Sequence, residues 1–254
     1  MRAIILAAGR GRRLGHNTDA IPKTMVPVGG KAMIERQLEA LAGAGIGRDR
    51  VHVVRGYLGD VLTRAYPDLH YFDNPAWERN NILASLMHAA DAFDDEVVFS
   101  YSDIVYAPEV ALALCQAPAA DALLVVDRRW RDTYEGRDQH PVPEAELARV
   151  DDGRVTRVGK RAVAAEAAAG EFIGLARFAK GTLGRVHAEW QRLVAVGGLD
   201  QPFGLSPRLE VAYLCDMLTH LIERGLEARP VYIDGRWREV DTEQDLERAH
   251  GAVR

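Results

Sequence analysis

The feature that most constrains the fold is a continuous apolar run at residues 3–8 that ends in a glycine- and arginine-rich turn. The run reads Ala-Ile-Ile-Leu-Ala-Ala, and the turn that follows it reads Gly-Arg-Gly-Arg-Arg-Leu-Gly. A strand that is apolar at successive positions is buried on both faces, which is typical of a parallel sheet covered by helices on each side. The start of the chain therefore predicts a central parallel strand followed by a tight turn.

Strand and helix patterns then alternate through residue 126. Apolar strands are predicted at 51–54, 69–72, 96–101 and 122–126, and helices at 31–44, 58–65, 82–93 and 108–116. This alternation predicts an α/β fold: a doubly wound, mostly parallel sheet with right-handed crossovers.

The pattern changes after Asp127. Residues 130–143 are polar and irregular, and two strands at 146–150 and 154–158 flank the turn Asp151-Asp152-Gly153, which predicts a hairpin. Later elements are a strand at 172–178, helices at 180–196 and 207–224, strands at 228–233 and 237–240, and a terminal helix from Thr242. We expect one domain over residues 1–254, with a small mixed β insertion at about 128–180 that forms a lid or acceptor site.

The charge balance and the apolar segments exclude several classes of partner. The chain has 32 Lys and Arg against 37 Asp and Glu, a net charge of -5, and no basic stripe, so nucleic acid is not an expected partner. No apolar segment is long enough to span a bilayer, and the first run is too short for a signal peptide. We therefore expect a cytoplasmic protein without a membrane partner. The two cysteines, Cys115 and Cys215, lie far apart in apolar stretches and predict buried free thiols.

The glycines of the first turn allow backbone N–H groups to approach phosphate oxygens, and its arginines add positive charge. The spacing does not match two common phosphate loops. A dinucleotide fingerprint requires glycine where Leu14 stands, and a Walker A loop requires glycine at Met25 and Ser or Thr at Ala32. From these residues alone, a phosphate-binding turn and a surface turn with solvated arginines remain equally open.

The turn and the segment beyond it resemble the signature of nucleotidyltransferases of the sugar-nucleotide pyrophosphorylase type. The two parts read Leu-Ala-Ala-Gly-Arg-Gly-Arg-Arg-Leu at 6–14 and Pro-Lys-Thr-Met-Val-Pro-Val at 22–28. The resemblance implies that Arg13 and Lys23 are catalytic and face a triphosphate. The nucleotide-binding positions that it implies are Leu6, Ala8, Gly9, Arg10, Gly11 and Arg12. Arg12 stands where the family often has a small residue.

Two carboxylates fit the same resemblance. Asp103 follows Ser102 at the end of a buried strand, at the carboxyl edge where such sheets bind ligands, and Asp241 lies near the C-terminus. The family has a metal-binding Asp at each of these stations, and Mg²⁺ prefers hard oxygen ligands. Taken alone, Asp103 fits a turn and Asp241 fits a helix cap. The resemblance implies Mg²⁺ as a cofactor on both carboxylates, with Asp103 also catalytic and Ser102 at the nucleotide.

Further stretches are similar to the cytidylyltransferases that act on phosphocholine or on alkylphosphonates, namely 74–86, 170–175 and 235–241. Asn81 and Ser85 lie one helical turn apart, so we expect both to face the nucleotide, although a helix cap and a surface serine fit equally well. The acceptor-binding candidates are Arg128, Lys160, Glu171, Asp216 and Trp237.

The chemical class of the acceptor stays open in the sequence. Aromatic residues of the second half fit either a cation–π wall for an ammonium group or ordinary core packing; they are Trp130, Tyr134, Tyr213 and Trp237. Arginines of the insertion suit an anionic acceptor instead; they are Arg128, Arg129, Arg131 and Arg137. His140 is expected to order the insertion and to take no part in catalysis.

The reaction that this resemblance implies is transfer of CMP from CTP to a small phosphorylated or phosphonate acceptor, with release of pyrophosphate. The acceptor oxygen is already anionic near pH 7, so no general base is required. A sugar-1-phosphate nucleotidyltransferase and a non-catalytic nucleotide-sensing subunit remain as alternatives, whereas the loop spacing disfavours an NAD-dependent oxidoreductase. The expected partners are CTP and the acceptor, and a homodimer remains open.

Overall fold

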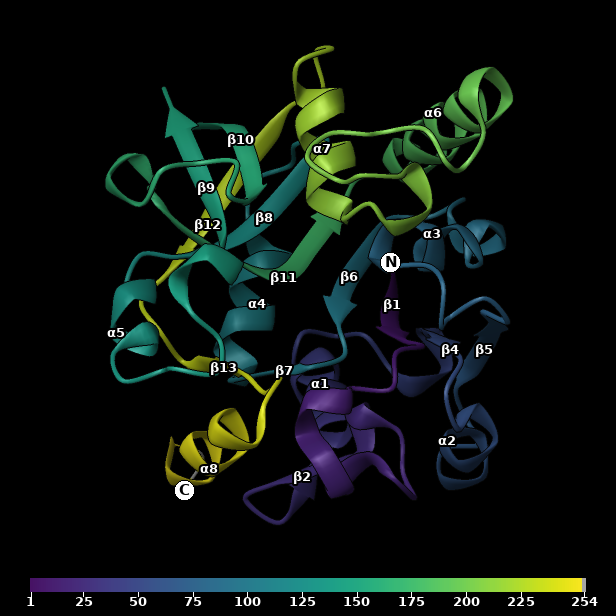
Figure 1. The fold of residues 1–254 in the computed structure, drawn as a ribbon, viewed down its shortest axis with the longest axis vertical. Coiled ribbons are helices and arrows are strands. Elements are labelled where there is room, and N and C mark those ends of the chain that lie inside the picture. Colours follow the sequence, from purple (N-terminus) through teal and green to yellow (C-terminus); the bar gives the residue numbers. More distant parts are fainter. Residues whose placement is uncertain (253–254) are drawn as a thin grey trace.

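The computed structural model describes residues 1–252, and a nine-stranded sheet forms their centre (Figure 1). The strands follow the order β10-β9-β11-β6-β1-β4-β5, with β8 paired to β11 and β12 paired to β8. Their bounds are β1 Arg2–Ala7, β4 Val51–Arg55, β5 His70–Asp73, β6 Val97–Tyr101, β8 Ala122–Asp127, β9 Glu146–Asp151, β10 Arg154–Lys160, β11 Gly170–Phe178 and β12 Ala228–Ile233. Two small sheets lie outside it: β2 Pro27–Val28 with β3 Lys31–Ala32, and β7 Ile104–Tyr106 with β13 Trp237–Glu239.

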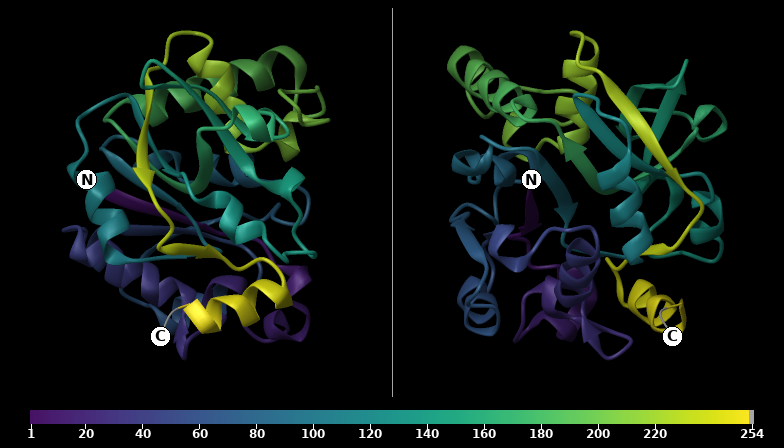
Figure 2. Two further views of the ribbon diagram at one scale, coloured as in Figure 1. Left: turned by 90° about the vertical axis from the view of Figure 1, so that its left-hand side faces the viewer. Right: turned by 180° about the vertical axis from the view of Figure 1, so that it is seen from behind.

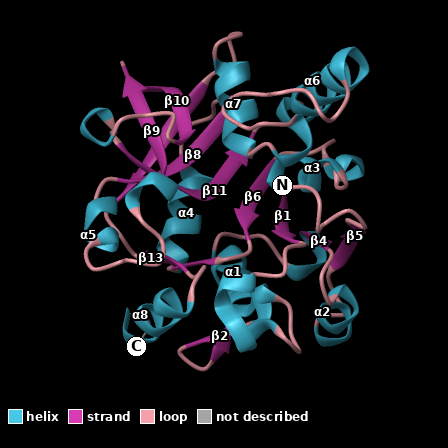
Figure 3. Cartoon of the chain, in the orientation of Figure 1, coloured by secondary structure: helices cyan, strands magenta, loops and turns pink. Residues whose placement is uncertain are grey.

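Helices cover both faces of the sheet (Figure 3). Their bounds are α1 Met33–Gly43, α2 Gly59–Ala65, α3 Ile82–Met87, α4 Pro108–Gln116, α5 Trp130–Tyr134, α6 Thr182–Gly197, α7 Leu214–Ile222 and α8 Glu243–Ala252. In the left view of Figure 2 the strands lie between green helices above and purple and yellow helices below.

The apolar run at the start of the chain is the centre of this arrangement. β1 pairs in parallel with β4 on one side and β6 on the other. Ile4 and Leu6 pack in a core with α3, α6 and α7, whereas Ala3 and Ile5 pack in a second core with α1, α2 and α4. A strand that faces two helical layers must be apolar at every position, because neither face meets water. The predicted doubly wound α/β fold is confirmed.

The strands of the predicted insertion at about 128–180 belong to the main sheet. β11 runs antiparallel to β6, β8 and β9, and the predicted hairpin β9–β10 extends the sheet beyond it. Gly174 interrupts β11 with a φ of 80°, where the register with β8 shifts, and a Cβ at Gly174 would lie 2.2 Å from Cδ2 of Tyr101. Glycine is therefore required for β11 to bend across the end of β6.

Several predicted boundaries were wrong. The helix expected at 207–224 begins only at Leu214, because the Asp216 carboxylate accepts from the Tyr213 backbone N–H at 3.0 Å and caps the helix there. α3 ends at Met87 instead of 93 and is followed by a 3₁₀ turn at Ala90–Ala92. The irregular stretch after residue 130 contains α5, and β7 was not predicted.

Two expectations from the sequence concern membrane-spanning segments and the cysteines. Within residues 1–252, no helix combines the length and the apolar character needed to cross a membrane. Cys115 and Cys215 are both free thiols. Cys215 is buried, as expected, whereas Cys115 is only half-buried.

Candidate active site

The glycine-rich turn after β1 is shaped around a lysine. Gly11 has a φ of 69°, and a Cβ there would lie 2.7 Å from Cδ of Lys23. Because glycine has no side chain, the methylenes of Lys23 pass directly over the turn. The two parts of the sequence signature, the turn and the Pro-Lys segment, are thus one packed unit. This packing places the Lys23 ammonium beyond the end of β1.

The Lys23 ammonium lies between two carboxylates that are distant in sequence. Its Nζ is 2.8 Å from Oδ2 of Asp103 and 2.6 Å from Oδ1 of Asp241. Asp103 follows β6, and Asp241 follows β13, which pairs with β7. The backbone N–H of Val240 also donates to the carbonyl of Asp103 at 2.8 Å. This short pairing brings the two acids together, and Arg13 forms a further ion pair with Asp241.

The charges of this cluster perturb one another. Burial by itself would lower the pKa of Lys23, but the Asp103 and Asp241 carboxylates raise that pKa above its usual value. Burial would likewise raise the pKa of Asp241, yet Lys23, His140 and Arg13 hold it well below its usual value. Oδ1 of Asp103 is buried without a hydrogen-bond partner among the described residues. Lys23 and Asp241 are therefore ionised near neutral pH, and Asp103 has one free acceptor atom.

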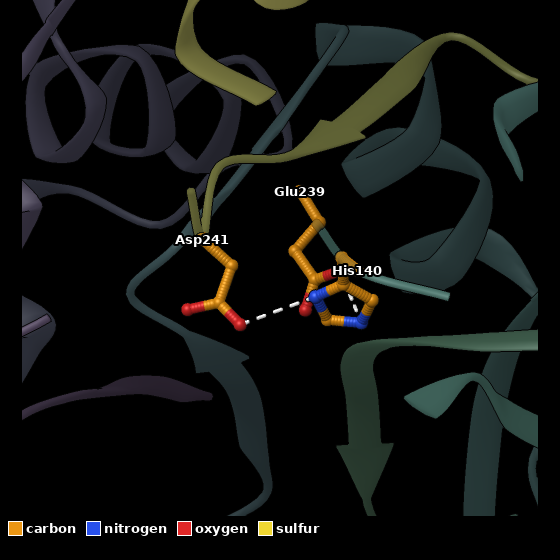
Figure 4. Close-up of side chains that lie close together, drawn as sticks. All are labelled: His140, Glu239 and Asp241. Carbon is orange, nitrogen blue, oxygen red and sulfur yellow. Dashed lines mark ion pairs between the residues drawn. The ribbon is translucent and has the colours of Figure 1, made fainter. Parts of the chain in front are cut away.

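His140 and Glu239 complete the cluster on the side of the insertion. His140 is 1% exposed, with Nδ1 3.3 Å from Oδ2 of Asp241 and Nε2 3.5 Å from Oε2 of Glu239 (Figure 4). One nitrogen or oxygen from each of these three residues lies within 4.8 Å of the others. From the sequence we expected His140 only to order the insertion, because it lies in an irregular loop where no periodicity shows which way a side chain points.

Arg137 holds this side of the site together. Its guanidinium donates to Asp245 at 2.6 Å and to Glu239 at 2.8 Å, and it is 7% exposed. Asp245 in turn accepts from the backbone N–H groups of Asp241 and Thr242 at 3.1 and 3.0 Å. From the sequence Arg137 was one of four arginines that would suit an anionic acceptor, but the carboxylates it contacts belong to the protein. Arg137 thus fixes the backbone that carries Asp241.

Two cavities meet at the paired carboxylates. The first, of about 280 Å³, follows the glycine turn and is here called the turn cavity; it is lined by Leu6, Gly9, Gly11, Arg12, Lys23 and Ser102. The second, of about 200 Å³, is here called the acidic cavity and includes Glu144, Glu146, Lys160, Glu171, Trp237 and Glu239. The residues that line both are Arg13, Ile82, Tyr101, Asp103 and Asp241. A molecule in each cavity would meet its neighbour beside Asp103 and Asp241.

Not every predicted nucleotide residue lines these cavities. Ala8 accepts from the backbone N–H of Tyr57 through its carbonyl, and Arg10 stacks over the Tyr57 ring at 5.1 Å. Ser85 is buried and accepts from Nδ2 of Asn74 at 2.7 Å, so its hydroxyl serves the packing of α3. Asn81 caps α3 by accepting from the backbone N–H of Ile82, and it lines the acidic cavity rather than the turn cavity.

Two of the predicted acceptor residues lie elsewhere. Arg128 follows β8 with its side chain 55% exposed and pairs with Asp234, 3.0 Å from its Nε. Asp216 caps α7 and accepts from the hydroxyl of Ser206 at 2.8 Å, so its charge has a structural partner. The other three, Lys160, Glu171 and Trp237, all line the acidic cavity.

Sequence comparison identifies three similar proteins whose activities are named. A Campylobacter jejuni protein named CTP:phosphoglutamine cytidylyltransferase is 34% identical over 97% of this chain and 98% of its own length. A Lancefieldella rimae protein named 2-aminoethylphosphonate cytidylyltransferase is 30% identical over 62% of this chain and 60% of its own length. A Streptomyces rubellomurinus protein named CMP-5'-(3-aminopropyl)phosphonate synthase is 34% identical over 48% of this chain, which is 20% of that protein.

Two solved structures share the fold of this chain. The CTP:phosphocholine cytidylyltransferase from Streptococcus pneumoniae superposes with a TM-score of 0.73 at 21% identity, over 100% of this chain and 99% of that one. The inositol-1-phosphate CTP transferase from T. maritima gives 0.72 at 19% identity, over 96% of this chain and 90% of that one. Residues 3–152, more than half of the 254, match the MobA-like NTP transferase domain. The chain therefore belongs to the MobA-like NTP transferase domain family.

Proposed function

We propose that this chain is a cytidylyltransferase that transfers CMP from CTP to a small phosphorylated or phosphonate acceptor and releases pyrophosphate. The observation that carries this proposal is the meeting of the turn cavity and the acidic cavity at Asp103, Asp241 and Arg13. A transfer between two bound molecules requires two adjoining sites with charged groups at their junction. The names of the three relatives, which all concern CTP or a CMP product, support the choice of nucleotide.

The reaction is a displacement at phosphorus. An anionic oxygen of the acceptor attacks the α-phosphorus of CTP, a new P–O bond forms, and the bond from the α-phosphorus to the bridging oxygen breaks. The electron pair of that bond leaves with pyrophosphate. No proton has to be removed from the acceptor near pH 7, because its phosphate or phosphonate is already ionised. The protein therefore has to align the reactants and neutralise charge.

The basic residues of the cluster fit the second task. Lys23 and Arg13 line the turn cavity beside the glycine turn, whose backbone N–H groups suit the phosphates. In the proposed reaction their cationic groups stabilise the negative charge that develops on the leaving pyrophosphate. Loss of one preorganised group of this kind lowers the rate by roughly 100-fold or more.

The carboxylates fit a divalent cation such as Mg²⁺. Asp103 and Asp241 supply hard oxygen atoms, and Oδ1 of Asp103 is a buried acceptor without a partner among residues 1–252. We propose that these two residues hold Mg²⁺, which when bound supplies positive charge beside the reacting phosphate. In the structure described here, the Lys23 ammonium balances the same two carboxylates.

A pyrophosphate-release assay tests the proposal. Purified protein is supplied with CTP, UTP, GTP or dTTP, each with phosphoethanolamine, 2-aminoethylphosphonate, phosphocholine or glucose 1-phosphate, with and without Mg²⁺. We expect release with CTP and a small acceptor, dependent on Mg²⁺. Asp103→Asn should lose about 100-fold in kcat, whereas Asp91→Asn, at an exposed aspartate in a surface turn, should retain full activity. CTP binding without any release, or an Asp103→Asn variant as active as the wild type, would reject the proposal.

A further inference from the structure

Glu171 carries an acceptor atom that no group of the described chain satisfies. The residue is the second of β11, is 4% exposed and lines the acidic cavity. Oε1 accepts from the hydroxyl of Tyr134 at 2.6 Å, whereas Oε2 is buried without a partner among residues 1–252. Burying a carboxylate oxygen without a donor is costly, so this geometry points to a donor supplied by a ligand. Burial, followed by repulsion from Glu239, raises the pKa of Glu171 to about 8, and a cation held against Oε2 would favour the ionised form of this carboxyl.

The surrounding wall favours a cationic ligand. Glu144, Glu146 and Glu239 line the same cavity as Glu171. Two cations line this cavity as well, and both are paired: Lys160 with Glu144 at 3.2 Å and Arg13 with Asp241. Carboxylates that face one cavity lower the energy of a positive charge placed among them. An ammonium group therefore fits the cavity better than an additional anion.

The aromatic side chains do not form the cage that a quaternary ammonium requires. Lys160 already lies over the Tyr213 ring at 4.8 Å, and Arg131 lies over Trp130 at 4.5 Å. Arg137 lies over Tyr134 at 5.2 Å. Trp237 is buried, and its indole N–H donates to Asp127 at 2.7 Å. The protein's own cations thus cover three of the four rings considered for a cation–π wall. Trp237 alone does not make a cage, so we expect recognition to come from hydrogen bonding.

We propose that Glu171 selects acceptors that carry a primary ammonium group, through an N–H···O bond to Oε2, and discriminates against trimethylammonium acceptors. This inference rests on the proposed transfer reaction and names the class of its acceptor. A primary ammonium has three N–H donors, whereas a quaternary ammonium has none. Aminoalkyl phosphates and phosphonates carry such a group, and so do phosphorylated amino acids.

Matched acceptors test the selection. Phosphoethanolamine and phosphocholine share one backbone and differ only in methylation of the nitrogen, and ethyl phosphate lacks the nitrogen altogether. O-phospho-L-serine adds a carboxylate and separates amino acid acceptors from simple amines. Each is assayed for kcat and KM with the wild type, Glu171→Gln, Glu171→Asp and the control Glu166→Gln, at an exposed glutamate. Glutamine keeps an oxygen for the Tyr134 hydroxyl but loses the charge.

We expect the wild type to favour phosphoethanolamine or O-phospho-L-serine over phosphocholine and ethyl phosphate. Glu171→Gln should lower kcat/KM for the preferred amine by about 10- to 100-fold, mainly through KM, the range for one hydrogen bond to a charged group. Its effect on ethyl phosphate should stay within about threefold, and Glu171→Asp should retain part of the preference. Equal use of phosphocholine and phosphoethanolamine, or an equal loss for every acceptor in Glu171→Gln, would overturn the inference.

Calorimetric titration of the same acceptors into protein saturated with CMP separates this inference from the proposed function. Amine-dependent binding that disappears in Glu171→Gln, without pyrophosphate release from CTP, would reject the transfer reaction and retain the ammonium site. Pyrophosphate release without any preference for the amine would retain the reaction and reject the ammonium site. Neither binding nor release with any acceptor would reject both.

Discussion

Replacing Glu171 with glutamine should stabilise the protein, and the gain should grow with pH. Burial is the main reason that the pKa of Glu171 is raised to about 8, and the charge of Glu239 adds to it, whereas the Tyr134 hydroxyl and Arg137 oppose the shift. The usual pKa of a glutamate is 4.5, so between pH 4.5 and about 8 Glu171 keeps a proton in the folded state that it has released in the unfolded state. The contribution of Glu171 to the free energy of unfolding therefore falls as the pH rises from about 4.5 to about 8, and it stays constant above that pH.

The size of the effect follows from the shift. One pKa unit corresponds to about 1.4 kcal/mol, so wild type should lose about 3 kcal/mol of unfolding free energy at Glu171 between pH 5 and pH 8. Glutamine does not titrate and still accepts from the Tyr134 hydroxyl. The difference in stability between Glu171→Gln and the wild type should thus increase by about 3 kcal/mol over this interval.

Urea unfolding at pH 5, 6, 7 and 8 measures this difference directly. Glu166→Gln, at an exposed glutamate, is the matched control and should show a difference that does not change with pH. A pH-independent difference for Glu171→Gln, or a variant less stable than the wild type at pH 8, would show that Glu171 is not a buried, unsatisfied acid. The same data exclude misfolding as the cause of any loss of amine recognition in this variant.

Two further substitutions test the frame around the site. Arg137→Met should lower the unfolding free energy by about 3–5 kcal/mol, because it leaves Glu239 and Asp245 without their buried cation. In the same urea titration Arg149→Met, at an exposed pair on β9, should cost less than about 1 kcal/mol, and equal losses would contradict the role given to Arg137. Gly174→Ala should cost at least about 2 kcal/mol from its positive φ and the contact with Tyr101. Gly184→Ala in α6 is the control, because a Cβ there meets nothing within 4 Å, and it should be neutral or slightly stabilising. Thermal melts measure both variants, and a larger loss of stability for Gly184→Ala than for Gly174→Ala would contradict the bend assigned to β11.

The central part of the fold could be predicted because its chemistry is local. The run at residues 3–8 must be buried on both faces, and the alternation of strands and helices that follows fixes which side chains enter each core. Gly11 and Lys23 belong to the two parts of one sequence signature, so their proximity could also be predicted from the sequence. Features of this kind depend on neighbours in the chain.

The other part of the site depends on partners that are distant in sequence. A strand at 237–240 was predicted, but β7 has only three residues and was not, so the sequence did not indicate the β7–β13 pairing that aligns Asp103 with Asp241. His140 and Arg137 lie in irregular segments whose contacts come from the C-terminal region. Arg128 lies outside the acidic cavity: an arginine after a strand can face a ligand or water, and here it pairs with Asp234 at the exposed surface. Ser85 does not line the turn cavity, because its hydroxyl accepts from Asn74 inside the fold.

The pairing of β13 with β7 also has a consequence for biosynthesis. The family match covers residues 3–152 and so contains Asp103 and the glycine turn, whereas Glu171 and Asp241 are translated later. A nascent chain that has emerged only through β12 already has the glycine turn but not the second carboxylate. The paired carboxylates can therefore meet only once the chain has been synthesised beyond β13 and this short strand has paired with β7.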